Sequence, residues 1–155
     1  MKTLTLCVLM KEGEVLLAMK KRGFGAGHWN GYGGKLEGNE TPEEAAVREV
    51  KEESGVDVVA ADLEKLGEIE FYFSDKPEWN QKVMIYRSFV WQGEPAETEE
   101  MKPAWFALDA IPYAEMWPGD DAWIPHLLRG EKFEGEIYFK EAGKGVEKSE
   151  IRVIV

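Results

Sequence analysis

Short apolar runs alternate with polar, glycine- and proline-containing segments along most of the 155-residue chain. The runs are rich in β-branched and aromatic residues and are bounded by turn-forming residues, a pattern typical of β-strands. We therefore expect strands at 3–10, 15–19, 56–60, 66–73, 82–91, 104–108, 133–139 and 151–155.

Residues 41–55 depart from this alternation and predict a helix. Thr41 suits the N-cap, Pro42 suits the first helical position, and Glu44 can complete a capping box with Thr41. Gly55 predicts the end of the helix, because the residue after a helix often has a positive φ.

Two shorter helices are expected nearer the C-terminus, one at 109–117 and one that starts at Asp120 or Asp121 and ends at Gly130. Strands both precede and follow the central helix. The order predicts a single α/β domain over residues 1–155, with a mixed β-sheet sandwiched between helices in an α/β/α arrangement.

The predicted helix carries an acidic face. At 100° per residue, Glu49, Glu52 and Glu53 lie together, beside an apolar stripe that includes Ala46 and Val50. Carboxylates at this spacing repel one another and destabilise a helix. A hard divalent cation would offset the repulsion, since such ions prefer carboxylate oxygens. A solvated acidic face is the alternative that the helix alone leaves open.

The spacing around this helix resembles the Nudix box, G-x5-E-x7-R-E-U-x-E-E-x-G-U, where U is an apolar residue. The box spans 34–55, with its last apolar position at 56, and is matched by Gly34, Glu40, Arg48, Glu49, Val50, Glu52, Glu53, Gly55 and Val56.

Resemblance to the Nudix hydrolases implies a Nudix fold and metal-assisted attack of water on a diphosphate. It implies Arg48, Glu52 and Glu53 as catalytic residues, with Arg48 orienting the glutamates through Glu52 or Glu40. It also implies a Mg²⁺ site, with Mn²⁺ as the alternative ion, whose ligands are Glu49, Glu52, Glu53 and the carbonyl of Gly33.

A glycine-rich segment, 23–35, leads into the box. It is not a Walker loop, because Lys35 is followed by Leu36, and it has no G-x-G-x-x-G register. Phe24 and Trp29 are poor linker residues. We interpret the segment as a shaped loop rather than a flexible linker.

Segments 19–35, 100–106 and 116–125 resemble the animal MutT-homologue family of 8-oxo-dGTP diphosphatases, which convert oxidised purine nucleoside triphosphates to monophosphate and pyrophosphate. This resemblance adds Glu100 to the metal site, although Glu100 can also be read as a surface acid. It implies that the substrate-binding residues are Thr5, Lys20, Phe24, Asn30, Tyr32, Gly33, Gly34, Lys35, Phe71, Phe73, Trp117, Pro118, Gly119, Asp120 and Trp123. For Phe71 and Phe73, a role in the core is the competing interpretation.

The chain departs from this family directly after Trp117-Pro118. The animal enzymes have two aspartates there, whereas this chain has Gly119 followed by Asp120 and Asp121. Three interpretations follow. Asp120 alone reads the base, or a shifted loop presents both aspartates, or Asp120 is only a helix N-cap.

Charge and composition narrow the choice of partner. A net charge of −11 argues against binding a nucleic acid polymer, and the first apolar run is too short to span a membrane. Cys7 is the only cysteine, so no disulfide forms within the chain. We expect a cytoplasmic monomer that acts on a small nucleotide.

Two rival functions stay open: a Nudix hydrolase acting on ADP-ribose, a dinucleoside polyphosphate or capped RNA, and a catalytically inactive nucleotide-binding Nudix domain. The segments that match outside the box disfavour the first. The intact set of Arg48 and three glutamates disfavours the second.

Overall fold

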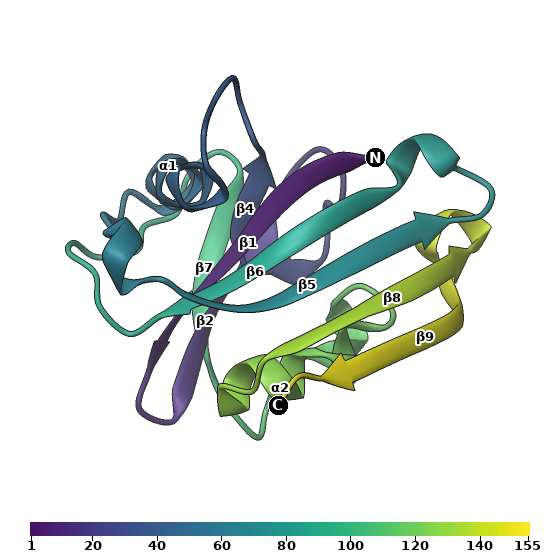
Figure 1. Cartoon of the computed structure of the whole chain (residues 1–155). Helices are drawn as coiled ribbons and strands as arrows, with labels where there is room; N and C mark the ends of the chain where they lie inside the picture. The colour runs from purple at the N-terminus through teal and green to yellow at the C-terminus, as the bar shows by residue number, and fades with distance from the viewer.

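The computed structural model describes all 155 residues and contains one nine-stranded mixed sheet (Figure 1). The strand order is β3-β2-β1-β6-β5-β8-β9, with β4 also paired to β1 and β7 to β2. The strands are β1 (Lys2–Lys11), β2 (Glu14–Lys20), β3 (Trp29–Asn30), β4 (Tyr32–Lys35), β5 (Glu64–Phe73), β6 (Gln81–Ser88), β7 (Met101–Ala107), β8 (Phe133–Lys140) and β9 (Gly145–Val153).

Two α-helices and five 3₁₀ turns complete the fold. None of the helices is long and apolar enough to cross a membrane. The helices are α1 (Pro42–Ser54) and α2 (Ile124–Arg129), and the 3₁₀ turns are Ala60–Asp62, Pro77–Trp79, Tyr113–Glu115, Asp120–Ala122 and Glu141–Gly143.

Strand β1 lies at the centre because both of its faces and both of its edges are used. Residues on alternate sides of the strand, such as Leu6 and Cys7, are buried in different clusters. One edge runs parallel to β6, while the other pairs antiparallel with β4 over residues 4–7 and with β2 over residues 9–11.

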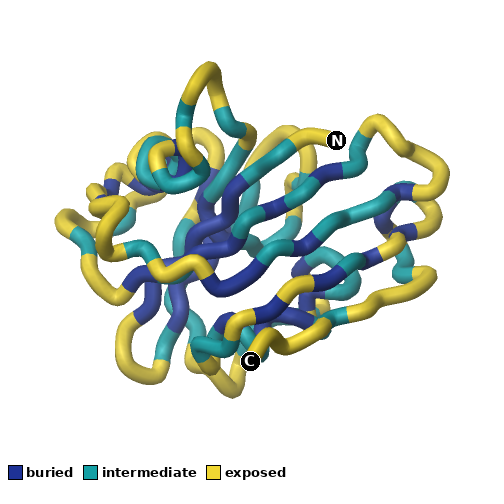
Figure 2. Tube along the Cα trace, viewed as in Figure 1, coloured by how far each residue is buried: buried dark blue, intermediate teal, exposed yellow.

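Helix α1 covers one face of the sheet only over β1, β4 and β7 (Figure 1). Ala46 and Val50 pack there with Cys7. On the opposite face, Trp123 and α2 join the larger core cluster. The outer face of β5, β8 and β9 has no helix over it, and β9 is largely exposed in Figure 2. The predicted α/β/α arrangement is therefore confirmed over the centre of the sheet, and it does not extend to β9.

The predicted ends of α1 are confirmed. The Thr41 hydroxyl accepts a hydrogen bond from the Glu44 amide at 3.1 Å, and the Glu44 carboxylate accepts one from the Thr41 amide at 2.9 Å. Gly55 ends the helix with φ 80°.

Two predicted elements are wrong. Residues 56–60 form no strand: Asp57 makes one isolated bridge to Gln92, and a 3₁₀ turn follows. Residues 109–117 form only the 3₁₀ turn at 113–115. Pro112, with ψ 61°, and the restriction that a proline places on the residue before it prevent an α-helix there.

Several boundaries also differ from the prediction. The strand expected at 104–108 runs from Met101 to Ala107, and α2 begins at Ile124, after a 3₁₀ turn, rather than at Asp120 or Asp121. The strand expected at 82–91 ends at Ser88, and the last strand runs from Gly145 to Val153 instead of over 151–155. Antiparallel pairing with β8 starts at Gly145, opposite Lys140, which extends the last strand toward the preceding turn.

Candidate active site

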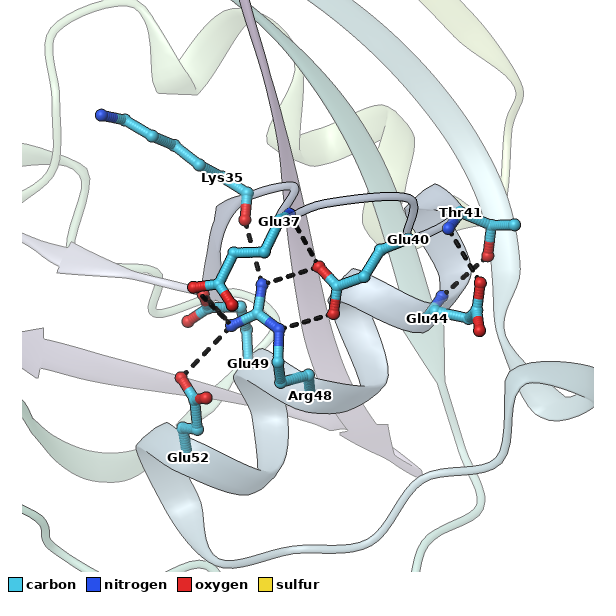
Figure 3. A network of polar contacts seen from close by, with 8 residues as sticks. All are labelled: Lys35, Glu37, Glu40, Thr41, Glu44, Arg48, Glu49 and Glu52. Carbon is cyan, nitrogen blue, oxygen red and sulfur yellow. Dashed lines mark hydrogen bonds and ion pairs between the residues drawn. The ribbon is translucent and has the colours of Figure 1, made fainter.

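Arg48 lies at the centre of a network of carboxylates on α1 and the loop before it (Figure 3). Its guanidinium donates hydrogen bonds to Glu40 at 2.6 and 3.0 Å, to Glu49 at 2.8 Å and to Glu52 at 3.3 Å. It also donates to the carbonyl of Lys35 at 3.0 Å. The predicted contacts of Arg48 with Glu40 and Glu52 are confirmed. Arg48 thereby fixes the loop before α1 to the acidic face of the helix.

Glu53 is buried on the last turn of α1 and connects the helix to β4. Its Oε1 accepts a hydrogen bond from the Gly33 amide at 2.8 Å. Burial is the main reason that the pKa of Glu53 rises to about 8, against the lowering effect of the Gly33 amide. Repulsion from Glu49 and Glu100 also raises this pKa, and Lys20 lowers it.

The glycines of β4 allow this close approach. A Cβ atom on Gly33 would lie 1.8 Å from the carbonyl oxygen of Thr5, and one on Gly34 would lie 2.6 Å from Oε1 of Glu49. No larger residue fits at either position without displacing backbone or the glutamate. Burial raises the pKa of Glu49, although Arg48 opposes the shift.

The predicted metal ligands gather at this end of α1, but they do not form a ready cluster of metal-binding side chains. Glu49 and Glu52 hydrogen-bond to Arg48, and Glu53 to Gly33. Glu100 is exposed on a loop, yet it lies near enough to raise the pKa of both Glu49 and Glu53. Glu49, Glu52, Glu53 and Glu100 are called the acidic donor set below. Hydrogen bonds from Arg48 and Gly33 hold the three glutamates of α1 in place.

A cavity of about 450 Å³ opens beside β4, over the larger core cluster. Phe24 stacks on Trp117 with ring centroids 5.2 Å apart, and Trp79 meets Phe24 edge-on at 5.1 Å. Such a lining suits a flat, aromatic ligand. The aromatic residues of the wall are Phe24, Phe71, Phe73, Trp79, Trp117, Trp123 and Phe139.

Asp120, Asn30 and Thr5 are polar side chains in the wall with unused hydrogen-bonding capacity. Asp120 is buried, and its Oδ1 accepts from the Trp123 indole at 3.1 Å; burial raises the pKa of Asp120 to about 8. The Oδ1 of Asn30 accepts from the Gly31 amide at 2.9 Å, so the NH₂ group of Asn30 stays free to donate. The buried hydroxyl of Thr5 has no partner.

Only one of the two neighbouring aspartates faces the cavity. Asp120 is buried in its wall, whereas Asp121 is exposed and outside it. Asp120 makes no capping hydrogen bond. The shifted-loop and N-cap interpretations are therefore wrong. Gly119 has φ 93°, and a Cβ atom there would lie 3.2 Å from both Ile137 and Val146.

Most of the predicted substrate-binding residues line the cavity. Three do not: Tyr32, Pro118 and Gly119. The Tyr32 side chain is fully buried in the cluster beneath α1, because Tyr32 points to the opposite side of β4 from Gly33. The lining residues are Thr5, Lys20, Phe24, Asn30, Gly33, Gly34, Lys35, Phe71, Phe73, Trp117, Asp120 and Trp123.

Several lining residues were not expected from the sequence, notably Lys2, Trp79, Gln81 and Phe139. Gln81 follows the same alternation as Val83, which could have placed it on the cavity side. Phe139 pairs with Phe73 across β8 and β5, a register that links distant segments and has no local signal.

Residues 2–127 match the protein family described as the NUDIX domain, which is more than half of the chain. The chain belongs to the Nudix family. An oxidized purine nucleoside triphosphate hydrolase of Danio rerio is 49% identical over 145 residues, covering 94% of this chain and 90% of the relative. The protein of the same name from Mus musculus is 48% identical over 137 residues, covering 88% and 86%.

The Nudix fold is also found by superposition. The crystal structure of the Mutator MutT protein from Bacillus halodurans has a TM-score of 0.83 and 24% identity, and the match covers 97% of each chain. Nudix hydrolases generally use divalent metal ions. The acidic donor set of this chain fits such an ion, because a cation would favour the charged forms of Glu49 and Glu53, whose pKa values are raised by burial first and by mutual repulsion second.

The raised pKa of Asp120 predicts a pH-dependent stability. The folded protein keeps Asp120 protonated up to about pH 8, whereas an unfolded aspartate ionises near about 3.9. The folded state binds more protons between these values, so its free energy of unfolding falls as the pH rises. Relative to Asp120→Asn, which cannot ionise, we expect the wild type to lose at most about 1.4 kcal/mol per pH unit across this window.

Denaturant unfolding from about pH 5 to about pH 8.5 measures this slope. Asp62→Asn is the control, because Asp62 is exposed and lies outside the cavity, and it should follow the wild type. Parallel curves for the wild type and Asp120→Asn would contradict the raised pKa.

Proposed function

We propose that the protein hydrolyses oxidised purine nucleoside triphosphates such as 8-oxo-dGTP to the monophosphate and pyrophosphate, with Mg²⁺, and so removes damaged precursors from the nucleotide pool. The observation that carries this proposal is that Gly33, Gly34 and Glu53 belong to the wall of the aromatic cavity. The cavity suited to a base and the acidic end of α1 therefore form one continuous site. The Danio rerio and Mus musculus relatives carry the matching name.

The base would bind among the aromatic rings, where stacking contributes roughly 1–3 kcal/mol per base. The free NH₂ group of Asn30 can donate to O6 of a guanine-type edge. When ionised, Asp120 can accept from N1–H and the C2 amine, and when protonated it can donate instead. Oxidation at C8 leaves this edge unchanged. Asn30 and Asp120 would therefore recognise the purine edge, with Asp120 in the protonation state that matches the donors and acceptors of that edge.

The phosphates would lie toward β4. Lys20 and Lys35 line the cavity there, and the Lys35 side chain extends away from the Arg48 network (Figure 3). A bound Mg²⁺ ion would neutralise phosphate charge and lower the pKa of the attacking water. Arg48 holds Glu49 and Glu52 in place, and Gly33 holds Glu53. Through these hydrogen bonds, the chain itself positions the three glutamates.

The proposed reaction should depend on Glu53. Glu53→Gln keeps an oxygen that can accept from Gly33 but removes one negative charge from the acidic donor set. We expect kcat to fall by at least ~10²-fold with the fold intact, as for the loss of one electrostatic or acid–base group. Steady-state kinetics measure kcat, and circular dichroism checks that the fold is intact. Glu99→Gln is the control, because Glu99 is exposed, and near wild-type turnover by Glu53→Gln would refute the assignment.

Mg²⁺ should stabilise the protein through the same residues. An ion that binds only the folded state raises stability by mass action, so millimolar Mg²⁺ should raise the Tm of the wild type. The rise should be smaller in Glu52→Gln/Glu53→Gln. The double variant Glu147→Gln/Glu150→Gln removes equal charge from exposed positions of β9 and should respond like the wild type. Equal shifts in all three proteins would place the ion elsewhere.

Release of pyrophosphate over a nucleotide panel tests the function as a whole. The wild type with Mg²⁺ should prefer 8-oxo-dGTP to dGTP, ADP-ribose and dinucleoside polyphosphates. Asp120→Asn should lose roughly 10- to 100-fold in kcat/KM for each charge-assisted hydrogen bond removed. Asp121→Asn should change little, because Asp121 lies outside the cavity. A preference for ADP-ribose, or equal losses in both variants, would reject the proposed base recognition.

A further inference from the structure

Gln81 is a buried polar residue in the cavity wall that base recognition by Asn30 and Asp120 does not use. Its side chain is 9% exposed. Nε2 of Gln81 donates to the carbonyl of Trp79 at 3.2 Å, and the amide oxygen makes no hydrogen bond within the protein. This oxygen is not one of the fully buried atoms without a partner, so it keeps access to the cavity, where a ligand group can donate to it.

The side chain of Gln81 points into the cavity because of its place in the sheet. Gln81 is the first residue of β6 and pairs with Lys2 on one side and Phe71 on the other. Gln81, Val83 and Ile85 share one face of β6, and all three line the cavity. Gln81 therefore occupies the end of the cavity floor where β1 begins.

Asn30 lies at the other end of this floor. It precedes Gly31, whose Cβ position would touch Leu6 and Val8. Leu6 is four residues along β1 from Lys2, the partner of Gln81, a distance of about 13 Å along a strand. Asn30 and Gln81 thus lie on opposite flanks of the space that a nucleoside would occupy.

The order of groups around guanine then decides what Gln81 meets. From O6 the ring continues through N1–H to the C2 amine, and then to N3 and the sugar. With O6 at Asn30 and N1–H at Asp120, the sugar edge faces away from Asn30. We propose that Gln81 is a specificity-determining residue whose amide oxygen accepts a hydrogen bond from a donor on the sugar edge, either a sugar hydroxyl or the C2 amine.

This inference rests on the proposed function, and binding of the monophosphate product tests it without turnover. The probes are 8-oxo-dGMP, its 2′,3′-dideoxy analogue, which lacks the sugar hydroxyl, and 8-oxo-dIMP, which lacks the C2 amine. Titration calorimetry would compare the wild type with Gln81→Met, which keeps the length of the side chain but not its acceptor. Gln92→Met is the matched control, since Gln92 is exposed and outside the cavity.

We expect Gln81→Met to weaken 8-oxo-dGMP binding roughly 3- to 10-fold, the usual worth of one neutral hydrogen bond, and Gln92→Met to leave it unchanged. Of the dideoxy analogue and 8-oxo-dIMP, one should bind to wild type and Gln81→Met with equal affinity. The group that this probe lacks is the donor to Gln81. Unchanged 8-oxo-dGMP binding by Gln81→Met would overturn the inference. If Gln81→Met weakened the binding of all three probes by the same factor, the inference would also be overturned, because Gln81 would then act only by supporting Trp79.

The control for the underlying function is separate. A wild type that binds none of the three probes would overturn the proposed function, and this inference with it.

Discussion

The hydrogen bond from the Gly33 amide to the buried carboxylate of Glu53 joins the two parts on which the site depends. It holds α1 against β4, and β4 in turn pairs with β1 at the centre of the sheet. The close pairing of β4 with β1 at this point is possible only because Gly33 has no side chain, since a Cβ atom there would collide with the backbone of Thr5. The same glycine strand forms part of the cavity wall. Packing of α1 and the shape of the cavity are therefore consequences of one close approach.

Two carboxyl groups at different places in the cavity wall have pKa values raised to about 8, and burial is the main cause in both. Their surroundings differ. Glu53 lies near Glu49 and Glu100, so a bound cation would favour its charged form, whereas Asp120 is buried at the aromatic end of the cavity and accepts a hydrogen bond from the indole of Trp123. Groups with such perturbed pKa values concentrate at functional sites, because catalysis and binding require groups with shifted pKa values. One end of the cavity thus suits a cation with phosphate, and the other suits a neutral, hydrogen-bonding base.

Local signals in the sequence predicted what depends on local structure. The capping residues and acidic face of α1 follow from spacing within one helix, and the contacts of Arg48 follow from the helix and the loop before it. Prediction was wrong where a proline restricts the backbone, as at Pro112, and at 56–60, where apolar residues are buried without a neighbouring strand. Trp79 and Phe139 could not be placed in the cavity wall, because their positions depend on the pairing of β5 with β6 and with β8. Such pairing leaves no trace in any single segment.

The residue that departs from the animal enzymes, Gly119, shows how backbone geometry limits the chemistry of the site. Its φ of 93° is disfavoured for residues with a side chain, and the space beside it is bounded by Ile137 and Val146. A second carboxyl group beside Asp120 would therefore need a different path of the chain after Trp117. Asp121 does not supply it, because the turn that begins at Asp120 directs Asp121 to the solvent. Because Asp120 is the only acid at the aromatic end of the cavity, further discrimination has to come from neutral groups, and Asn30 and Gln81 are the amides placed to provide it.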